Sequence, residues 1–585
     1  WGGRPVMAKT RVATLALLTS LAVTAAACGR LHVGGSSKGR EMDVALRATL
    51  RQAKAPSFVT ADQEGKRLWK KTQEFYASRE FKPAWIENAA PRPQMDDLIG
   101  ALSSASTEGL DPELYSVGLL KQRREEASKG FLTSKGFDPR EAGMLDVWLT
   151  YLYMKYASDL ADGLSDLAHA DPAWQIKTEK LDPRAQLDSA LEHNNVSASL
   201  QELAPVAPEY QALRKVLADY RDRATKGGWP AVPASLKLKP GQRSPAVPLV
   251  ARRLAASGDF GGQVPPDGQP AAYDKGLQEA VKKFQRRHGL ADDGVVSAAV
   301  VSEMNVPIDR RIRQIELNME RWRWLPRDLG GRHIFVNIPD MRLDVWDHDR
   351  VPLSMRVVVG KKDTPTPIFN DTMTYLVFSP YWNVPPDIAN KETLPAVMSD
   401  PGFLERTNME VVDKSGNLVD PASIDLTKPE DYRFRQRPGA DNSLGLVKFM
   451  FPNQYNVYLH DTPADSLFAR ASRSFSHGCV RVEQPEKLAE YVLGDQPDWT
   501  DDKITEAMHA GEEKTVKLKQ PLPVYIAYLT ARVTPDGAVQ FRKDVYDVDG
   551  SQTARLAQRL ERLRKAAIAA AKVAALSRGG SPAAQ

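Results

Sequence analysis

Cys479 is the residue in this chain best suited to covalent chemistry, because it ends the string Ser476-His477-Gly478-Cys479 and has His460 nineteen positions upstream. A cysteine attacks a carbonyl carbon as its thiolate, and a nearby imidazole can accept the thiol proton and later return it. The small residues Ser476 and Gly478 allow a tight turn whose N–H groups would face a developing oxyanion. The string therefore predicts a cysteine nucleophile with an imidazole base.

Two histidines compete for the role of base. His460 follows a strand-like run, Tyr455 to Leu459, so a rigid strand would present its ring to a cleft. His477 is closer in sequence, but side-chain directions in a tight turn do not follow from spacing. We expect His460 to be the base, with a backbone carbonyl near Asp461 fixing its tautomer. We expect His477 to place the substrate or to support the oxyanion site.

The alternative for Cys479 is an inert cysteine in a hydrophobic core. A Ser-His-Gly-Cys string is not an apolar run, which favours catalysis. An activated thiol would also react with iodoacetamide faster than free cysteine at pH 7. The chain has only one other cysteine, Cys28, so we expect no disulfide to brace the protein body.

Composition bounds the possible partners. The chain has 585 residues, 42% hydrophobic and 26% charged, which is typical of several soluble globular domains. Its formal charge of +5 comes from basic surpluses of three in residues 1–27 and six in residues 551–585, which leave −4 for the body. The chain lacks an aromatic-plus-basic RNA-binding motif, a phosphate loop and paired zinc cysteines. We therefore expect no nucleic-acid partner and no metal.

The N-terminus has the pattern of an export signal. Lys9 and Arg11 precede an apolar stretch, Val12 to Ala27, that is shorter than the ~20 residues of a spanning helix. We predict that residues 1–27 are a cleaved signal peptide. Cys28 follows three alanines and resembles the acylated cysteine of bacterial lipoproteins, although the pattern usually has an aliphatic residue where the first alanine stands. The resemblance implies a periplasmic, membrane-anchored lipoprotein; ordinary cleavage with an unmodified Cys28 is the alternative.

The first half of the chain is predicted to be mostly helical. Residues 28–57 contain a Gly/Ser-rich run, Gly34 to Gly39, and are expected to form a flexible tether. Residues 58–225 have apolar side chains at helical spacing, which predicts a helical scaffold domain. An apolar and aromatic stripe of this type more often forms part of a hydrophobic core than a ligand site. The clearest one consists of Met144, Leu145, Trp148, Leu149, Leu152, Tyr153 and Tyr156.

The middle of the chain predicts a linker, a small helical module and a bridging helix. Residues 226–243 are rich in Gly, Pro and Lys, which is typical of a linker. Residues 244–306 are expected to form the helical module, with Phe284 in its core. His288 is expected at a helix end and not on a metal, since no partner stands at ligand spacing. Residues 307–330 predict a basic amphipathic helix that returns to the scaffold.

The remainder predicts a β-rich domain over residues 331–550. From His333 the apolar spacing changes to two, which indicates a β-meander or barrel. An irregular, partly helical insertion at about 385–437 is expected to be a lid over a site. A hairpin around Asp536-Gly537 is expected to close the fold. Residues 551–585 predict a basic Ala/Arg-rich helical tail, either solvated or docked on the scaffold.

These motifs together resemble a known family. The pattern of His460 followed by Ser476-His477-Gly478-Cys479 is similar to the active site of the YkuD-type L,D-transpeptidase domain, a β-rich fold; in papain-like and NlpC-type hydrolases the cysteine comes first. Residues 280–290 resemble the peptidoglycan-binding module, and segments around Trp85 and Leu110 resemble the scaffold domain of the large L,D-transpeptidases. Further strings match the long, lidded periplasmic subgroup: Tyr381-Trp382-Asn383-Val384-Pro385, Arg435-Gln436-Arg437-Pro438-Gly439, Asn442-Ser443-Leu444-Gly445, Phe451-Pro452-Asn453 and His460-Asp461-Thr462-Pro463. The implied fold class is multidomain α+β.

The resemblance implies a reaction on peptidoglycan stem peptides. The Cys479 thiolate would attack the amide between diaminopimelate and a terminal D-alanine, D-alanine would leave, and a thioester would remain. The diaminopimelate amine of a second stem would resolve the thioester and form a 3→3 cross-link. Water in place of the amine would give an L,D-carboxypeptidase, and a protein amine would give a protein-attachment enzyme. A non-catalytic wall-binding protein is a third class, and the intact His460/Cys479 pair argues against it.

The resemblance also assigns further residues. The N–H groups of Gly478 and Cys479 would form the oxyanion site. Arg481 would pair with a substrate carboxylate, or would belong to a structural ion pair. The implied substrate-binding set is Ser476, Arg481, Tyr458, Trp382 and Asn383. A cysteine nucleophile further implies inhibition by carbapenem-type acylating agents and no metal or organic cofactor.

Overall fold

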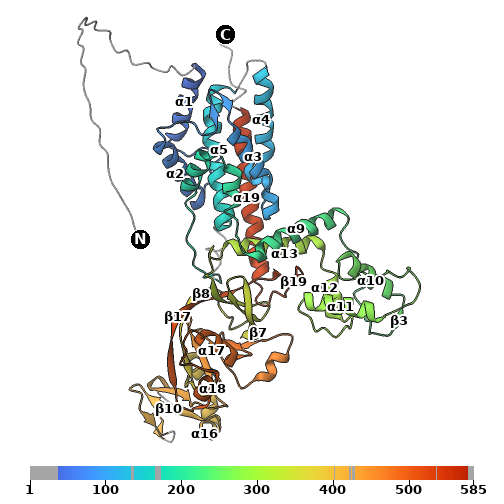
Figure 1. Ribbon diagram of the computed structural model, residues 1–585, viewed down its shortest axis with the longest axis vertical. Helices are drawn as coiled ribbons and strands as arrows, with labels where there is room; N and C mark the ends of the chain where they lie inside the picture. Colours follow the sequence, from blue (N-terminus) through green and yellow to red (C-terminus); the bar gives the residue numbers. More distant parts are fainter. Residues whose placement is uncertain are drawn as a thin grey trace, which may run out of the picture.

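The computed structural model describes most of the chain. The described residues are 37–132, 137–164, 173–400, 402–420, 423–424, 429–534 and 536–576. The predicted signal peptide, Cys28 and the end of the tail from residue 577 lie outside them. A helical bundle lies at one end of the molecule and a β-rich part at the other (Figure 1).

The bundle is built around α5 (Pro139–Asp162). Nearly every residue of this helix from Ala142 to Ala161 is buried, as expected of a helix surrounded on all sides. Asp138 begins the helix by accepting hydrogen bonds from the N–H groups of Arg140 and Glu141. The other helices of the bundle are α1 (Ser37–Leu50), α2 (Gln63–Ser78), α3 (Pro93–Ser103), α4 (Val117–Leu132), α7 (Pro183–Glu192), α8 (Val196–Gln201) and α9 (Pro208–Thr225).

Helix α1 corrects the prediction that residues 28–57 form a flexible tether. Residues 37–50 are helical and pack along α5. Met42, Leu46 and Leu50 recur at four-residue spacing and are buried in the bundle core. Burying this stripe outweighs the roughly 1 kcal/mol that Gly39 costs in a helix, which composition alone does not reveal.

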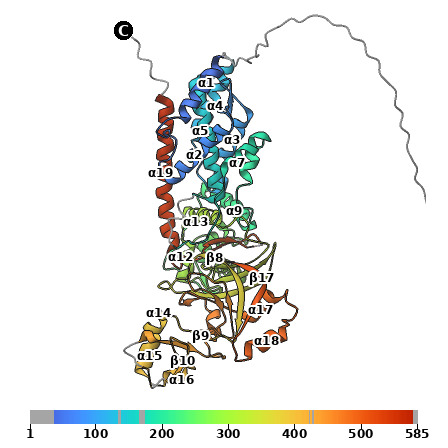
Figure 2. The ribbon, with the colours of Figure 1, turned by 90° about the vertical axis from the view of Figure 1, so that its left-hand side faces the viewer.

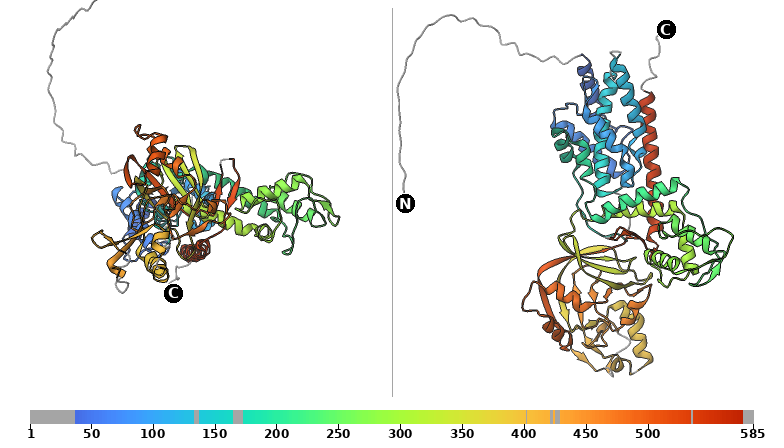
Figure 3. Two further views of the ribbon diagram at one scale, coloured as in Figure 1. Left: turned by 90° about the horizontal axis from the view of Figure 1, so that it is seen from below. Right: turned by 45° about the vertical axis from the view of Figure 1, so that its right-hand side comes forward.

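The small module forms a separate hydrophobic core. It contains α10 (Val247–Ala256), α11 (Lys275–Arg287), α12 (Ala298–Met304) and a short ladder of β3 (Arg243–Ser244) with β4 (Ala271–Ala272). Val232, Leu236 and Leu238 are buried in the same core, and Leu238 forms a β-bridge with Val296. The prediction of a linker over residues 226–243 is therefore wrong from Val232 onward. Figure 3 shows the module projecting to one side of the molecule.

Within the predicted bridging segment 307–330, the structure has the helix α13 (Ile308–Arg323), which packs against α9. The C-terminal helix α19 (Val548–Leu576) lies along the bundle (Figure 2). Arg564 of α19 forms an ion pair with Asp111 at 2.6 Å, and the side chain of Leu563 is buried in the core. Of the two predicted alternatives for the tail, the structure has the scaffold-docked helix.

The β-rich part is a closed sheet. Its hydrogen-bonded order is β15-β7-β16-β14-β13-β8-β17-β5-β6, and β6 also pairs with β7, which closes a barrel. The strands predicted from the apolar spacing after His333 are present as β5 and β6, although burial does not alternate along them because most of their side chains are buried. The strands are β5 (Arg332–Asn337), β6 (Arg342–Asp347), β7 (Arg350–Gly360), β8 (Phe369–Phe378), β13 (Val447–Met450), β14 (Leu459–His460), β15 (Ser474–Ser476), β16 (Val480–Val482) and β17 (Lys514–Ala527). Helices α17 (Pro485–Leu493) and α18 (Asp501–His509) pack beside it.

The inserted segment is more regular than the sequence suggested. Its strands form a four-stranded antiparallel sheet: β9 (Trp382–Asn383), β10 (Met409–Asp413), β11 (Leu418–Val419) and β12 (Tyr432–Gln436). Its helices are α14 (Pro386–Ile388), the π-helical turn η3 (Ala389–Thr393), α15 (Leu394–Ser399) and α16 (Phe403–Arg406). Val384, Leu404, Val411 and Phe434 form a separate core, so the insertion is a small subdomain.

The predicted C-terminal hairpin exists as β18 (Ala531–Val533) and β19 (Val539–Phe541), but it forms its own two-stranded sheet and does not join the barrel. Arg532 on β18 contacts both neighbouring domains. Its Nη2 lies 2.5 Å from Glu209 of α9 and 3.3 Å from Asp344 of β6. This largely buried hairpin therefore connects the scaffold to the barrel.

No helix among the described residues is long and apolar enough to span a membrane.

We expect Leu46→Ala to lower the free energy of unfolding of the helical bundle by about 2–5 kcal/mol, because it leaves a cavity between α1 and α5. Val44 on the same helix is 68% exposed, so Val44→Ala should change the free energy of unfolding by no more than about 0.5 kcal/mol. Urea unfolding followed by circular dichroism measures both. Equal effects of the two substitutions would contradict the docking of α1.

Candidate active site

Two short parallel strands bring the predicted site residues together. In the pairing of β14 with β16, Leu459 faces Val480 and His460 faces Arg481. Val480 N–H donates to the carbonyl oxygen of Tyr458 at 3.2 Å, which places Cys479 beside Tyr458. β13 flanks β14 and β7 flanks β16, so neither strand lies at an edge. A register shift of one residue would turn His460 to the other face of the sheet.

His460 is buried and held in one tautomer. Its Nδ1 lies 2.6 Å from the carbonyl oxygen of Asp461. A carbonyl only accepts, so Nδ1 carries the proton and Nε2 is left as the acceptor. Burial, and then the positive charge of Arg481, lower the pKa of His460 to about 3. The ring is therefore a neutral imidazole at pH 7, which is the protonation state of a base.

Cys479 is half-buried, and its surroundings disfavour the thiolate. Its Sγ lies 3.7 Å from the carbonyl oxygen of Asn456, an acceptor that suits a thiol. Burial raises the pKa of the thiol, and this effect outweighs the N–H and hydroxyl of Tyr458 and the charge of Arg481, which lower it. Burial, and then the proximity of Cys479, also raise the pKa of Tyr458.

The resting site thus holds a neutral thiol and a neutral imidazole on two paired strands. Within the described part of the chain, no hydrogen bond joins the sulfur of Cys479 to the ring of His460. The expectation that imidazole already draws the thiol to its thiolate does not agree with these pKa directions. Burial is the cause, because it disfavours both the thiolate of Cys479 and the imidazolium of His460. The spacing of residues along the sequence does not reveal this burial. Such a pair transfers its proton only as the sulfur attacks.

The turn before Cys479 is held by hydroxyl groups. Gly478 has φ +120°, a conformation that side-chain-bearing residues rarely adopt. Ser476 Oγ accepts from Gly478 N–H at 3.1 Å and donates to the carbonyl oxygen of Cys479 at 2.5 Å. Thr366 Oγ1 donates to the carbonyl oxygen of Gly478 at 2.8 Å. The Gly478 N–H is already bonded, so the predicted oxyanion role for it is not supported in the resting structure.

Arg481 has no ion-pair partner among the described residues, and its buried Nε has no acceptor. Burial lowers the pKa of Arg481, and the neighbouring Cys479 offsets part of this effect. The structural ion pair considered as an alternative is therefore not formed. A half-buried guanidinium beside the cysteine remains free to bind a carboxylate.

The insertion contacts the cysteine turn through one polar pair. His477 Nε2 lies 2.8 Å from Oε1 of Glu392 in η3. Both side chains are partly exposed, so the pair stabilises this contact by at most about 1 kcal/mol. Trp382 and Asn383 lie in β9, where they pair with Gln436 and Arg435 of the same subdomain. The structure therefore connects the insertion to the site through Glu392, and the backbone partners of Trp382 and Asn383 lie within the insertion.

Thr366, Asn456 and Glu392 take part in the site although sequence reasoning did not select them. No spacing signal identifies them, because each comes from a different loop or turn. No group of three or more His, Cys, Asp or Glu residues suited to a metal ion occurs in the described ranges.

We expect alkylation of Cys479 to depend on pH as a raised thiol pKa requires. In a Cys28→Ser chain, the rate with iodoacetamide should rise with pH and level off only above the ~8.5 of a free cysteine, because the neutral thiol persists below the raised pKa. The rate at pH 7 should be below that of free cysteine. A rate already constant from about pH 5 would indicate a thiolate–imidazolium pair and contradict this protonation state.

Comparison with known proteins agrees with this geometry. Residues 331–526 match the family model "L,D-transpeptidase catalytic domain" (YkuD), residues 70–217 match "Scaffold domain", and residues 243–304 match "Putative peptidoglycan binding domain". A Haemophilus influenzae protein named "Putative L,D-transpeptidase" is 25% identical over 477 residues, which cover 81% of this chain and 77% of that protein.

Solved structures of L,D-transpeptidases are also similar to parts of the chain. The Mycobacterium smegmatis enzyme is 15% identical, with 34% of this chain and 58% of that chain covered and a TM-score of 0.16. The Xylanimonas cellulosilytica enzyme is 15% identical, with 50% of this chain and 98% of that chain covered and a TM-score of 0.16. The assignment therefore depends on the family models and the relative. The chain contains an L,D-transpeptidase catalytic domain joined to a scaffold domain and a peptidoglycan-binding domain, and these matches support an enzyme of the L,D-transpeptidase type.

Proposed function

We propose that this enzyme forms 3→3 cross-links in peptidoglycan through a thioester on Cys479. The observation that carries the proposal is the neutral pair of Cys479 and His460, whose Nδ1 is held by Asp461 while Nε2 remains an acceptor. The donor is a stem tetrapeptide that ends in D-alanine. The acceptor is the diaminopimelate amine of a second stem.

In the first half-reaction the sulfur attacks the carbonyl carbon between diaminopimelate and D-alanine. His460 Nε2 takes the thiol proton as the C–S bond forms, and the carbonyl oxygen becomes an oxyanion. The tetrahedral intermediate collapses, the C–N bond breaks, and His460 returns the proton to the amine of the departing D-alanine. A thioester on Cys479 and a neutral His460 remain.

The second half-reaction restores the enzyme. The amine of the acceptor stem attacks the thioester, and His460 accepts one of its protons as the new amide forms. The C–S bond then breaks, and the proton returns to the sulfur. A buried site favours attack by the acceptor amine over hydrolysis, because water reaches the thioester less readily. With water as acceptor, the same steps would give a carboxypeptidase.

Arg481 is proposed to bind a carboxylate of the donor stem. Its buried Nε has no partner within the described residues, and a guanidinium can hold a carboxylate through two hydrogen bonds. The Cys479 N–H is the proposed oxyanion donor. Ser476 is proposed to support the turn and Tyr458 to flank the substrate. His477, through its contact with Glu392, would position the insertion over the bound stem, where Trp382 and Asn383 would lie as well.

The location of the enzyme is proposed from its N-terminus and its substrate. Peptidoglycan lies outside the cytoplasmic membrane, and Lys9, Arg11 and the apolar stretch that follows them are typical of an export signal. We therefore propose a periplasmic enzyme that is anchored through an acylated Cys28. The cysteine nucleophile also makes the enzyme a proposed target of carbapenem-type acylating agents.

We expect the soluble chain to convert disaccharide-tetrapeptide into dimers joined from diaminopimelate to diaminopimelate, with D-alanine released. Cys479→Ala should abolish both products, because the thioester cannot form. Mass spectrometry of the reaction measures both. Tripeptide monomers without dimers would replace the proposal by an L,D-carboxypeptidase, and unchanged tetrapeptide would refute this donor.

Arg481→Gln should raise KM for the tetrapeptide about 10- to 150-fold, the range for a lost hydrogen bond to a charged group of roughly 1.5–3 kcal/mol. The matched control is Arg433→Gln on the exposed surface of β12, which should leave KM unchanged. Alkylation of Cys479 should persist in both variants. A variant of Arg481 with unchanged KM would show that this guanidinium does not bind the donor.

A further inference from the structure

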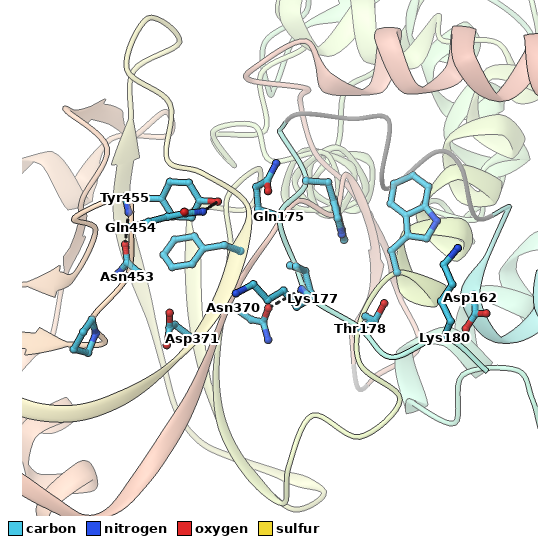
Figure 4. Close-up of a pocket in the computed structure, with 15 residues that line it drawn as sticks. Asp162, Gln175, Lys177, Thr178, Lys180, Asn370, Asp371, Asn453, Gln454 and Tyr455 are labelled. Atoms are coloured by element: carbon cyan, nitrogen blue, oxygen red, sulfur yellow. Dashed lines mark hydrogen bonds between the residues drawn. The ribbon is translucent and has the colours of Figure 1, made fainter. Parts of the chain in front are cut away.

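A cavity lies between the scaffold domain and the barrel. Its volume is about 660 Å³, within the range of small-molecule sites. Figure 4 shows Asn453, Gln454 and Tyr455 on one side, Asn370, Asp371 and Lys177 in the middle, and Lys180 with Asp162 on the other side. Neither the mechanism nor the comparisons give this cavity a role.

The walls of the cavity are joined by backbone hydrogen bonds between the two domains. Trp174 forms a parallel bridge with Ile368, and Gln175 N–H donates to the carbonyl oxygen of Ile368 at 2.8 Å. Lys177 N–H donates to Oδ1 of Asn370 at 3.0 Å. An isolated β-bridge and these hydrogen bonds thus join the scaffold segment to the barrel, so the cavity is a fixed part of the fold.

One loop connects the cavity to the nucleophile. Asn453, Gln454 and Tyr455 line the cavity, and the next residue, Asn456, places its carbonyl oxygen 3.7 Å from the sulfur of Cys479. The side chain of Asn453 holds this loop rigid. Its Nδ2 donates to the carbonyl oxygens of Phe451 and Val457, and its Oδ1 accepts from the N–H groups of Tyr455 and Val457. The loop that lines the cavity therefore also contacts the cysteine.

The lining carries charges of both signs that are not neutralised by the protein. Lys177 is exposed, Asp371 is half-buried, and neither has an ion-pair partner in the described part of the chain. Side-chain amides of Asn370, Asn453 and Gln454 line the same cavity. A ligand that fits this lining has a carboxylate for Lys177, an ammonium group for Asp371, and peptide groups for the amides of Asn370 and Gln454. An uncharged sugar polymer would leave both charges unpaired.

We propose that this cavity binds a second stem peptide of peptidoglycan, separate from the stem bound at Cys479. The substrate class rests on the proposed function, because a stem that ends in diaminopimelate carries ammonium and carboxylate groups on one short peptide. Binding in the cavity holds a neighbouring stem close to the nucleophile and raises its effective concentration there. The scaffold domain thereby forms part of a substrate site.

The test measures binding without turnover. The full chain carrying Cys479→Ala is titrated by calorimetry with the tripeptide L-alanyl-γ-D-glutamyl-diaminopimelate, which cannot act as a donor. The double variant Lys177→Gln/Asp371→Asn should weaken its Kd at least 10-fold. The control pair Lys121→Gln/Asp97→Asn, on exposed helical surfaces of the scaffold, should leave Kd unchanged.

Two further measurements separate the cavity from the reaction. Acylation of Cys479 by a carbapenem should proceed equally in the cavity variant and in the unmodified chain, which shows that the cysteine site is intact. Loss of tripeptide binding in the cavity variant supports the proposed cavity site even if the enzyme does not cross-link the tetrapeptide. Failure to cross-link the tetrapeptide would refute only the proposed function. Equal Kd in the variant and the control pair, or weakened binding of an N-acetylglucosamine tetramer instead of the tripeptide, would overturn the proposal.

Discussion

The parallel pairing of β14 with β16 is the constraint on which the active site depends. It fixes His460 beside Arg481 and brings Cys479 to Tyr458, although these residues come from different turns of the chain. Each strand is only two or three residues long, so the pair is stable only because β13 and β7 flank it inside a closed barrel. Closure removes free edges, and the backbone partners of both strands are thereby fixed.

Burial in this sheet sets the chemistry of the nucleophile. It lowers the pKa of His460 and raises that of Cys479, so the charges that catalysis needs are absent at rest. The site instead holds a neutral imidazole with a fixed tautomer and a neutral thiol. The guanidinium of Arg481, which has no ion-pair partner among the described residues, leaves a positive charge beside the cysteine, where we propose that a carboxylate of the donor binds.

The domains are joined by polar contacts that also shape the surroundings of the site. Arg532 connects α9 to the barrel through Glu209 and Asp344, and the strand-like segment from Trp174 to Lys177 connects the bundle to β8. Such buried pairs stabilise little by themselves but fix orientation when every group is satisfied. The cavity beside Tyr455 exists because of this fixed orientation.

The sequence by itself determined the chemical types and the order of the domains. Its Ser-His-Gly-Cys string predicted a cysteine site, and its changes of apolar spacing predicted bundle, module and β-rich domain, because local periodicity reports which face of an element is buried. It misjudged α1, which becomes a helix by packing on α5, and the start of the module at Val232, because burial between distant segments leaves no local signal. Only the tertiary structure decided the protonation states of Cys479 and His460, the use of the Gly478 N–H by Ser476, and the contact from Glu392. These depend on desolvation and on atoms brought together from separate loops, which no spacing along the chain can encode.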